Sequence, residues 1–384
     1  MKPRRTKIVA TLGPAVDSVD SIAGLLKAGA DVLRLNLSHG LREDHRRFVE
    51  QSREAQASTG RNVALMVDLQ GPRLRVGTIE GGTMVLETGS QATLTSRDVH
   101  GADGVVPVTY DRLEDDLEEG VRVLIDDARI ECLVREVTSE GVLVDVVRGG
   151  ELGNRKGINM PDFRISSPSV TEKDMDDIRW AASAGIDYLA VSFLRDAETV
   201  NQVRRELHRN GAEVPVVAKI ELSDAVDNIH SIVAASDAVM VARGDLGIEL
   251  PLSRIPLIQK QIVDHCNKQA KPSIIATQML ESMTENPRPT RAEVSDVANA
   301  ILDGADAVML SGETAVGRYP KEAVSQMDCV ARDIEAAGII ETPELEGFPE
   351  GLPIPVAVSQ STVDLARRLD ARVIITFTTS GFTA

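Results

Sequence analysis

The chain has 384 residues, with 42 lysines and arginines against 59 aspartates and glutamates, so its formal net charge is −17 at pH 7. Its length predicts two or three domains, since a domain averages roughly 150 residues. The negative charge and an aromatic content of only 3% argue against a protein that binds nucleic acid through basic patches and stacking rings.

The sequence shows no sign of a membrane segment or of export. No apolar run approaches the roughly 20 residues of a transmembrane helix. The first 14 residues have a basic head but lack the apolar stretch of a secretory signal. The chain has three cysteines, which lie far apart in the sequence at Cys132, Cys266 and Cys329. This odd number and wide spacing fit neither a disulfide framework nor a zinc site. We therefore expect a cytoplasmic protein with no membrane partner.

Eight short runs rich in Val, Ile, Leu and Ala recur along the chain, and helical periodicity follows most of them. Parallel strands that are buried on both faces have this composition. Eight such units predict a closed (β/α)8 TIM barrel, with functional groups at the carboxyl ends of the strands. The runs span residues 7–12, 32–37, 64–69, 188–193, 216–221, 238–244, 273–278 and 307–312. Helix N-caps are predicted at Asp17, Thr171, Asp196, Ser223 and Thr290.

Two regions depart from this rhythm. Residues 73–166 alternate apolar and polar residues in short pieces separated by glycines, which predicts an inserted β-rich, barrel-like lid domain. The catalytic barrel would then comprise residues 1–72 and 167–340. After a helix at 321–337 and a linker rich in Pro, Gly and Glu, residues 350–384 begin an incomplete C-terminal α/β domain, with a helix at 356–369 and a strand at 373–377. So short a fragment cannot bury a core alone, so it is either truncated or docked on another surface.

Polar residues cluster at the carboxyl ends of the predicted strands. Lys219 and Glu221 are two apart on one strand and share a face, where their burial is costly unless they have a function. Asp245 on the next strand adds a second carboxylate, and such oxygen ligands suit magnesium. The arrangement predicts a site for phosphate chemistry. The full set is Arg34, Asn36, Ser38, Asp68, Lys219, Glu221, Arg243, Asp245, Thr277 and Glu313.

Each motif taken alone has an ordinary structural explanation. Taken alone, Lys219 and Glu221 could form an ordinary surface ion pair. Taken alone, His39 is more often a structural or solvent-exposed histidine than a ligand. The acidic run at 115–119 reads as a solvated surface. The combination of AKIE (218–221) with ARGDLG (242–247) on the next strand is what favours a functional site.

Six ordered motifs resemble pyruvate kinase, and the likeness runs from about residue 6 to the last residue. The resemblance implies transfer of the phosphoryl group of phosphoenolpyruvate to ADP, giving pyruvate and ATP in the last step of glycolysis. The family assembles as tetramers, so we expect a homo-oligomer. The closing TTSGFTA (378–384) resembles the family's effector-phosphate loop, although a plain loop explains it equally well. The motifs are RLNLSHG (34–40), DLQGPRLR (68–75), AKIE, ARGDLGIE (242–249), ATQMLESM (276–283) and LSGETAVGRYP (310–320).

The resemblance also assigns roles by position. It implies that Arg34 and Lys219 neutralise the migrating phosphoryl group, as phosphoryl transfer requires. Glu221 and Asp245 would hold Mg²⁺ (or Mn²⁺), and the backbone at Gly244 and Asp245 would bind the substrate carboxylate. Thr277, Ser311 and Glu313 would lie on the side that protonates the enolate, with the proton donor left open. Nucleotide contacts map to Asn36, His39, Arg75 and Lys156.

One departure from the family pattern concerns potassium. Many members read Thr-Lys-Gly-Pro-Glu where this chain has Leu69-Gln70-Gly71-Pro72-Arg73. In the family that glutamate accompanies a K⁺ ion, whose ligands match Asn36, Ser38, Asp68 and the Leu69 carbonyl. Because Arg73 puts a fixed positive charge there, we predict that K⁺ is dispensable.

Two other functions remain as alternatives. A pyruvate-enolate aldolase or lyase on a similar barrel would also require a divalent metal, and Lys219 could form a Schiff base with its substrate. Dependence on ADP and borohydride trapping of substrate on Lys219 separate it from a kinase. A catalytically silent metabolite-sensing scaffold would bind phosphoenolpyruvate without turning it over.

Overall fold

The computed structural model describes residues 4–161, 163, 166, 168–338, 354–369, 371 and 373–376. The chain divides into two compact units, Met1–Thr342 and Pro343–Ala384. Within the described residues, no helix is long and apolar enough to cross a membrane.

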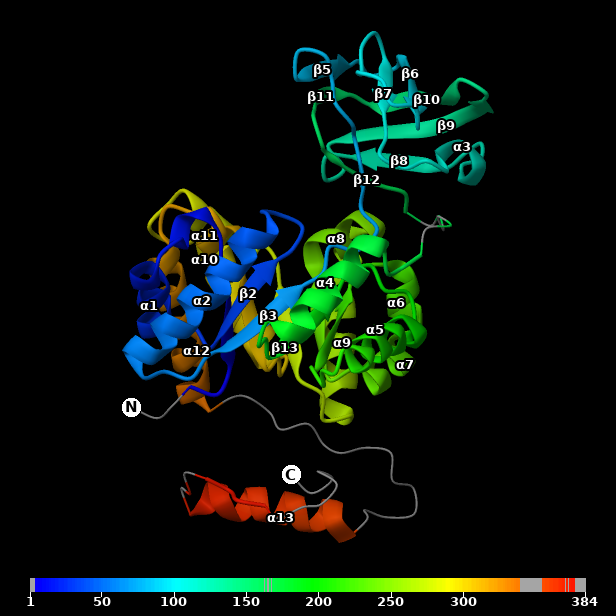
Figure 1. Cartoon of the computed structure of the whole chain (residues 1–384). Coiled ribbons are helices and arrows are strands. Elements are labelled where there is room, and N and C mark those ends of the chain that lie inside the picture. Colours follow the sequence, from blue (N-terminus) through cyan, green and yellow to red (C-terminus); the bar gives the residue numbers. More distant parts are fainter. Residues whose placement is uncertain are drawn as a thin grey trace. The chain divides into compact units, whose positions relative to one another are not determined.

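A closed barrel of eight parallel strands forms the centre of the first unit (Figure 1). Neighbouring strands pair in parallel, and the pairing of the last strand with the first closes the ring. Every predicted apolar run supplies one strand, so the (β/α)8 prediction is confirmed. The strands are β1 (Lys7–Thr11), β2 (Val32–Asn36), β3 (Ala64–Asp68), β13 (Tyr188–Val191), β14 (Val216–Ile220), β15 (Ala238–Ala242), β16 (Ser273–Ala276) and β17 (Ala307–Leu310).

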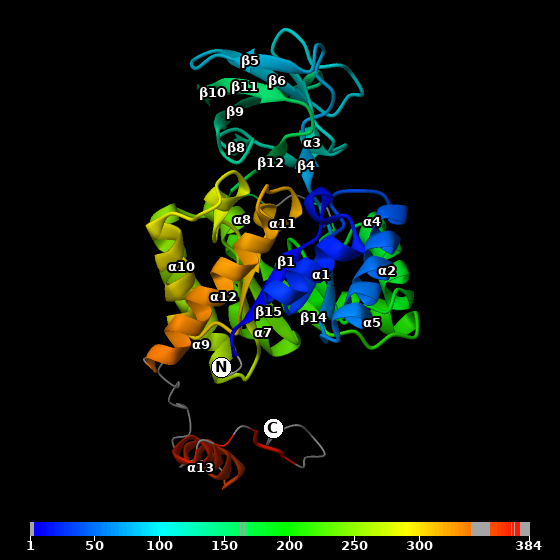
Figure 2. The same cartoon turned by 90° about the vertical axis from the view of Figure 1, so that its left-hand side faces the viewer.

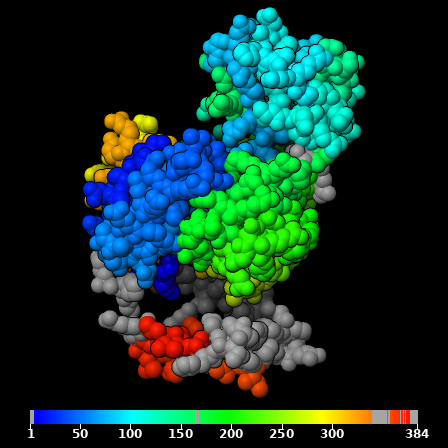
Figure 3. Space-filling view, in the orientation of Figure 1, coloured from blue at the N-terminus to red at the C-terminus, as the bar shows by residue number. Residues whose placement is uncertain are grey.

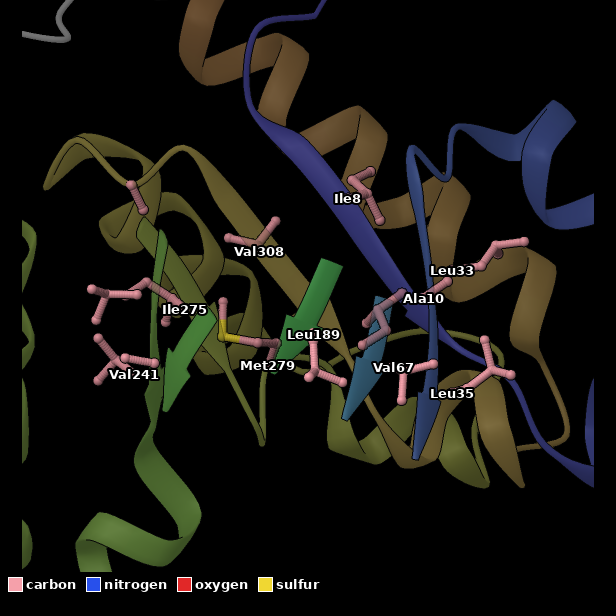
Figure 4. Close-up of a cluster of buried hydrophobic side chains, with 14 of the residues drawn as sticks. Ile8, Ala10, Leu33, Leu35, Val67, Leu189, Val241, Ile275, Met279 and Val308 are labelled. Atoms are coloured by element: carbon pink, nitrogen blue, oxygen red, sulfur yellow. The ribbon is translucent and has the colours of Figure 1, made fainter. Parts of the chain in front are cut away.

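The barrel strands are buried on both faces, which explains why they read as continuous apolar runs. Side chains alternate between the two faces of a strand. In β1, Val9 belongs to a small cluster with Met66, Met240 and Met309. Its neighbours Ile8 and Ala10 belong to the large cluster that the strands share with the helices. Figure 4 shows part of the large cluster, including the labelled side chains of Ile8 in β1, Leu33 in β2 and Val308 in β17.

Helices surround the barrel (Figure 2). In the space-filling view, the N-terminal helices in blue and the helices from the middle of the chain in green lie side by side and form one continuous surface (Figure 3). They are α1 (Val19–Ala28), α2 (Arg42–Thr59), α4 (Glu172–Ser183), α5 (Ala197–Arg209), α6 (Ser223–Asp227), α7 (Ile229–Ala235), α8 (Arg243–Glu249), α9 (Ile255–Lys268), α10 (Arg291–Leu302), α11 (Gly312–Ala315) and α12 (Pro320–Ala337), with 3₁₀ turns at Pro14–Val16, Leu252–Arg254 and Glu281–Thr284.

Three of the five predicted N-caps are confirmed. Thr171, Asp196 and Thr290 each accept a hydrogen bond from the backbone N–H three residues later. The prediction of Asp17 was wrong, because Ser18 forms a capping box with Ser21 and the Asp17 carboxylate instead pairs with Arg47. The prediction of Ser223 was wrong as well, because Ser223 is the first residue of α6 and the N-cap position is taken by Leu222, which makes no side-chain capping hydrogen bond.

The segment that follows β3 is rich in β structure, as its alternating pattern predicts. Seven strands form one sheet in the order β4-β12-β8-β9-β10-β6-β7, and β11 pairs with β5. Leu94, Val123 and Val142 are among the fully buried residues of its separate core. Its boundaries at 73 and 166 stay a prediction. The elements are β4 (Leu74–Arg75), β5 (Thr83–Leu86), β6 (Gln91–Thr95), β7 (Val105–Pro107), α3 (Leu113–Asp116), β8 (Arg122–Ile125), β9 (Ile130–Thr138), β10 (Gly141–Arg148), β11 (Gly150–Gly153) and β12 (Gly157–Asn159).

The second unit contains helix α13 (Ile354–Arg368), which starts two residues before the predicted helix. The strand predicted at 373–377 was wrong for residues 373–376, which are described and form no strand. A strand needs a partner for its N–H and C=O groups, and the described part of the chain supplies none there. Phe377 and the TTSGFTA segment lie outside the described residues, and the domain assignment of 350–384 stays a prediction.

Candidate active site

Buried charged side chains converge at the carboxyl ends of β2, β3 and β14. Arg34 donates from Nε and Nη2 to Oδ2 of Asp68, at 2.7 and 2.6 Å. Lys219 places Nζ 3.2 Å from the other oxygen of the same carboxylate. All three residues are less than 9% exposed. Asp68 therefore joins the two cations that the sequence assigned to the phosphoryl group, and it fixes both beside each other.

The Lys219 ammonium lies among three oxygen atoms. Besides Asp68, its Nζ is 2.6 Å from Oγ of Ser192 and 2.7 Å from Oε1 of Glu221. Burial favours the neutral amine, yet the negative charges of Asp68 and Glu221 prevail and hold the pKa of Lys219 above its usual value. Lys219 therefore stays a cation at neutral pH. A lysine that forms Schiff bases needs a lowered pKa, so this environment disfavours the lyase alternative.

Asp68 stays ionised in the same cluster. Burial raises the pKa of its carboxyl, but the nearby charges of Lys219 and Arg34 outweigh burial and lower that pKa overall. Arg34 has a further tie, since its Nη1 donates to Oγ1 of Thr11 at 3.0 Å, and Thr11 in turn donates to the Leu310 carbonyl at 2.8 Å. These contacts fix the guanidinium from two sides.

Glu221 and Asp245 form a pair of neighbouring carboxylates. Glu221 is fully buried, and its Oε2 accepts a 2.6 Å hydrogen bond from the Phe193 N–H. Its Oε1 lies 2.7 Å from Nζ of Lys219. Burial raises the pKa of Glu221, and the negative charge of Asp245 raises it further. A divalent cation would relieve the repulsion between the two carboxylates, so these residues fit a magnesium site.

Arg73 also reaches this part of the site. Its Nη2 lies 3.5 Å from Oδ1 of Asp245, and its guanidinium stacks over the Phe193 ring with 5.4 Å between the carbon and the ring centroid. Both side chains of the ion pair are partly exposed. The structure therefore places the residue that departs from the family pattern against a predicted metal ligand.

The start of α8 meets the end of β16 at Gly244 and Thr277. Gly244 donates its N–H to Oγ1 of Thr277 at 2.8 Å. A Cβ on Gly244 would lie 3.3 Å from that oxygen, so glycine permits the close approach. Thr277 has a φ of 69°, a left-handed conformation that is uncommon for a threonine. In this structure the Gly244 N–H that the sequence assigned to a substrate carboxylate is bonded to Thr277.

Glu313 links the loops that follow β16 and β17. It is fully buried, and its two oxygens accept hydrogen bonds from the N–H groups of Leu280 at 3.0 Å and Ser311 at 2.7 Å. The Ser311 hydroxyl is buried and has no hydrogen-bond partner among the residues that the structure describes. Burial raises the pKa of the adjacent Glu281, and the charge of Glu313 raises it further. Glu313 is thus bound to backbone, unlike the charge-paired Asp68.

The loop that carries Asn36, Ser38 and His39 is held at its carbonyl groups. Lys173 donates to the Leu37 carbonyl at 3.0 Å, and Nε2 of His45 donates to the His39 carbonyl at 2.8 Å. Within the loop, the Asn36 amide oxygen accepts the Ser38 N–H at 3.1 Å. The Asn36 side chain therefore orders its own loop.

The predicted nucleotide contacts are only partly brought together. Burial lowers the pKa of His39, and the charges of Arg75, Arg73 and Arg34 lower it further, which places the two lid-side arginines near the imidazole. Lys156 instead forms a 2.9 Å ion pair with Asp126 in the β-rich segment. Arg75 donates to the Arg155 carbonyl at 2.9 Å.

The comparisons with known proteins agree with this geometry. A model of the pyruvate kinase barrel domain matches residues 3–324. The chain belongs to the pyruvate kinase family. It is 47% identical over 381 residues to a pyruvate kinase of Corynebacterium efficiens, covering 99% of this chain and 80% of that protein. A Mycobacterium tuberculosis pyruvate kinase is 45% identical over 380 residues, with the same coverage. A crystal structure of a pyruvate kinase from Cryptosporidium parvum superposes with a TM-score of 0.89 at 36% identity, covering 99% of this chain and 80% of that one.

Sequence reasoning missed two hydroxyl residues of this pyruvate kinase family site. Ser192 directly follows β13, and Thr11 ends β1. Both therefore satisfy the rule that polar residues at the carboxyl ends of barrel strands are candidates, and applying it to hydroxyls as well as charges would have found them. Arg243 directly follows β15 and pairs with Asp296 of α10 at 2.7 Å.

Proposed function

We propose that this protein transfers the phosphoryl group of phosphoenolpyruvate to ADP, giving pyruvate and ATP in the last step of glycolysis. The observation that carries the proposal is the pair of buried cations, Arg34 and Lys219, held side by side by the Asp68 carboxylate. Phosphoryl transfer needs little covalent chemistry from the protein, so positioned positive charge in a water-poor site is its main catalytic requirement.

The proposed work of the cations follows from their surroundings. Arg34 bonds Asp68 through Nε and Nη2 and Thr11 through Nη1, which fixes the orientation of its planar guanidinium. Lys219 is a compact charge kept protonated by its two carboxylates. Together they neutralise the migrating group as it leaves the enolate oxygen, and their contacts are formed in advance.

Glu221 and Asp245 would hold Mg²⁺ (or Mn²⁺), for which their carboxylates fit. When bound, the metal supplies charge neutralisation and aligns substrate oxygens. Glu221 is held for this task by the Phe193 N–H at one oxygen and by Nζ of Lys219 at the other. Arg73 forms an ion pair with Asp245.

On the other side of the site we propose that Thr277 lies by the enolate carbon and that Gly244 and Asp245 border the substrate carboxylate. The Thr277 hydroxyl is fixed by two bonds, accepting from Gly244 N–H and donating to the Ala276 carbonyl at 2.6 Å. Glu313, with Ser311, acts by holding the two loops that enclose this side. ADP would contact Asn36, His39, Arg75 and Lys156, with the β-rich segment closing over the phosphates.

We also propose that turnover does not need K⁺. The ligands that the family pattern assigns to a monovalent cation are Asn36, Ser38, Asp68 and the Leu69 carbonyl. Here the Leu69 carbonyl accepts the Ser192 hydroxyl at 2.8 Å, and Asp68 is engaged by both cations. Arg73 adds a fixed guanidinium in place of the carboxylate that would attract the ion.

A coupled assay tests these proposals together. Purified protein with magnesium, ADP and phosphoenolpyruvate is monitored through lactate dehydrogenase, with and without K⁺ in a sodium-free buffer. We expect pyruvate formation that requires ADP and does not change when K⁺ is added. Pyruvate formation without ADP, with borohydride trapping of Lys219, would favour the lyase. Binding of phosphoenolpyruvate without turnover would favour the scaffold.

Assembly and location follow from the same proposal. We expect a homo-oligomer, as in the family's tetramers, and a cytoplasmic location suited to glycolysis. Light scattering of the purified protein measures the mass, and a monomer at working concentration would contradict the first expectation.

A further inference from the structure

The Ser192 hydroxyl lies at the centre of the cationic cluster but carries no charge. Ser192 follows β13 and is 2% exposed. Its Oγ is 2.6 Å from Nζ of Lys219, 2.8 Å from the Leu69 carbonyl and 3.2 Å from Oδ1 of Asp68. A single hydroxyl therefore contacts the catalytic ammonium, the carboxylate that joins the two cations, and the backbone at the end of β3.

The directions of these hydrogen bonds are fixed by the chemistry of the partners. An ammonium only donates, and a carbonyl only accepts. The hydroxyl must therefore accept from Lys219, and its one proton goes to the Leu69 carbonyl, with the longer contact to Asp68 as the competing acceptor. Ser192 thus ties the Lys219 nitrogen to the backbone of the neighbouring strand.

The two carboxylates contact the ammonium as well. Glu221 Oε1 lies 2.7 Å from Nζ, and Asp68 is 3.2 Å away. They provide the charge that keeps the lysine protonated, and the serine adds a neutral acceptor that is itself bonded to the Leu69 carbonyl. The attraction of the ammonium to two carboxylates lets it shift from one to the other, because Coulomb attraction has little directionality. A directed hydrogen bond to the serine restricts that movement.

The backbone holds Ser192 in place. The next residue, Phe193, has a φ of 53° and gives its N–H to Glu221. Gly71 packs directly against this turn, because a Cβ there would lie 2.8 Å from the Phe193 ring and 3.2 Å from Cβ of Ser192. The hydroxyl is therefore held on a rigid segment that also orients Glu221.

We propose that Ser192 is a positioning residue for Lys219, whose hydroxyl holds the ammonium at the point from which it meets the migrating phosphoryl group. The inference rests on the proposed function. Since misplacement of a catalytic group by about 1 Å can cost about a hundredfold in rate, loss of the hydroxyl should act on kcat much more than on the KM for phosphoenolpyruvate.

The test uses two substitutions of Ser192 in the full chain. Ser192→Ala removes the hydroxyl, and Ser192→Cys keeps a similar volume with a poor hydrogen-bonding group. We expect both to lower kcat by about 10- to 100-fold and to change the KM for phosphoenolpyruvate by less than about threefold, with thermal melting close to wild type. Ser236→Ala is the matched control, because Ser236 is also fully buried but bonds the Ile232 carbonyl at the end of α7; its kcat should not change.

A second readout does not depend on turnover. A crystal structure of Ser192→Ala shows whether Nζ of Lys219 leaves the position that it holds 2.6 Å from the serine oxygen. We expect Nζ to move away from that position once the hydroxyl is gone.

The outcomes separate the two proposals. If wild type turns over phosphoenolpyruvate and both variants keep wild-type kcat, the positioning role is wrong. If Ser192→Cys is normal and only Ser192→Ala fails, the residue fills space and the role is again wrong. If wild type shows no turnover, the proposed function fails, and an unmoved Nζ of Lys219 in the Ser192→Ala crystal structure would then overturn the tie to Lys219 itself.

Discussion

The two halves of the barrel rim hold their polar groups in opposite ways. At β2, β3 and β14, Arg34, Asp68 and Lys219 bind one another through charged side chains. At β16 and β17, Glu313 binds the backbone N–H groups of Leu280 and Ser311. We call the first group with Glu221 the charged cluster, and Glu313 with its two partners the backbone-bound cluster.

Under the proposed function, this difference gives each half a task of its own. Cations that neutralise a migrating phosphoryl group have to stay charged although they are buried, and nearby carboxylates keep them charged. A carboxylate committed to backbone amides instead fixes the loops around the site. Substitutions in the charged cluster should therefore affect chemistry, and those in the backbone-bound cluster should affect loop order and stability.

The largest effect is expected from Lys219→Met, which keeps the volume but removes the charge. Transition-state charge on the phosphoryl group would lose its nearest ammonium, so kcat should fall by about a thousandfold or more. The coupled assay measures kcat and circular dichroism checks the fold. Near-normal turnover by the folded variant would remove Lys219 from the mechanism.

The next effect concerns Arg34→Lys. The guanidinium bonds Asp68 through two nitrogens, and a lysine has no such fork, so kcat should fall by about a hundredfold. Arg47→Lys is the control, because Arg47 makes a similar two-nitrogen contact with Asp17 on the surface. Equal losses in the two variants would show that the Arg34 contact has no special role.

A smaller effect on rate, with a clear effect on stability, is expected from Glu313→Gln. The amide keeps one acceptor and loses the other, so a backbone N–H becomes unsatisfied and the free energy of unfolding should drop by about 1–3 kcal/mol. Glu335→Gln is its partner, since Glu335 accepts backbone N–H groups of Arg5 and Thr6 at the opposite end of the barrel.

Urea unfolding of both glutamine variants measures the stability term, and the coupled assay measures kcat. We expect similar losses of stability, but a loss of kcat, about tenfold, only for Glu313→Gln. A normal kcat in both variants would show that the backbone-bound cluster does not order the site.

Arg73→Glu should change cation dependence more than rate. Restoring the carboxylate usual in the family should make turnover rise by about tenfold or more when K⁺ is added, since it recreates an attraction of a few kcal/mol for a monovalent ion. Arg97→Glu changes the charge equally at an exposed ion pair with Glu140 and should not respond to K⁺. A K⁺ requirement in wild type would contradict this account of Arg73.

The smallest effect is a chemical contrast between buried and exposed thiols. Burial, aided by Asp306, raises the pKa of Cys266 to about 12, and burial with Glu131 raises that of Cys132 to about 11. Cys329 is exposed. Iodoacetamide at neutral pH should therefore label Cys329 alone in the native protein, with no loss of activity; rapid labelling of Cys266 would indicate a looser core.

Much of the fold follows from local pattern. The barrel strands were predictable because burial on both faces demands apolar runs, and Thr171 and Thr290 were predictable because a capping hydroxyl acts within three residues. Asp17 failed because two neighbouring residues both suited the cap. The strand at 373–376 failed because pairing depends on a partner, which local sequence does not contain.

The site divides in the same way. Arg34, Asp68, Lys219 and Glu221 could be predicted to converge, because the carboxyl ends of parallel strands meet at one rim. The contacts of Ser192 and the pairing of Lys156 with Asp126 could not, because a short hydroxyl or a flexible ammonium chooses partners through space.

The most direct test is to follow the phosphorus atom by ³¹P NMR with phosphoenolpyruvate, ADP and magnesium. The account predicts that the phosphoenolpyruvate signal is replaced by the signals of ATP in the wild-type protein, and that Lys219→Met leaves it in place. Release of inorganic phosphate without ATP, or the same transfer by the Lys219→Met protein, would contradict it.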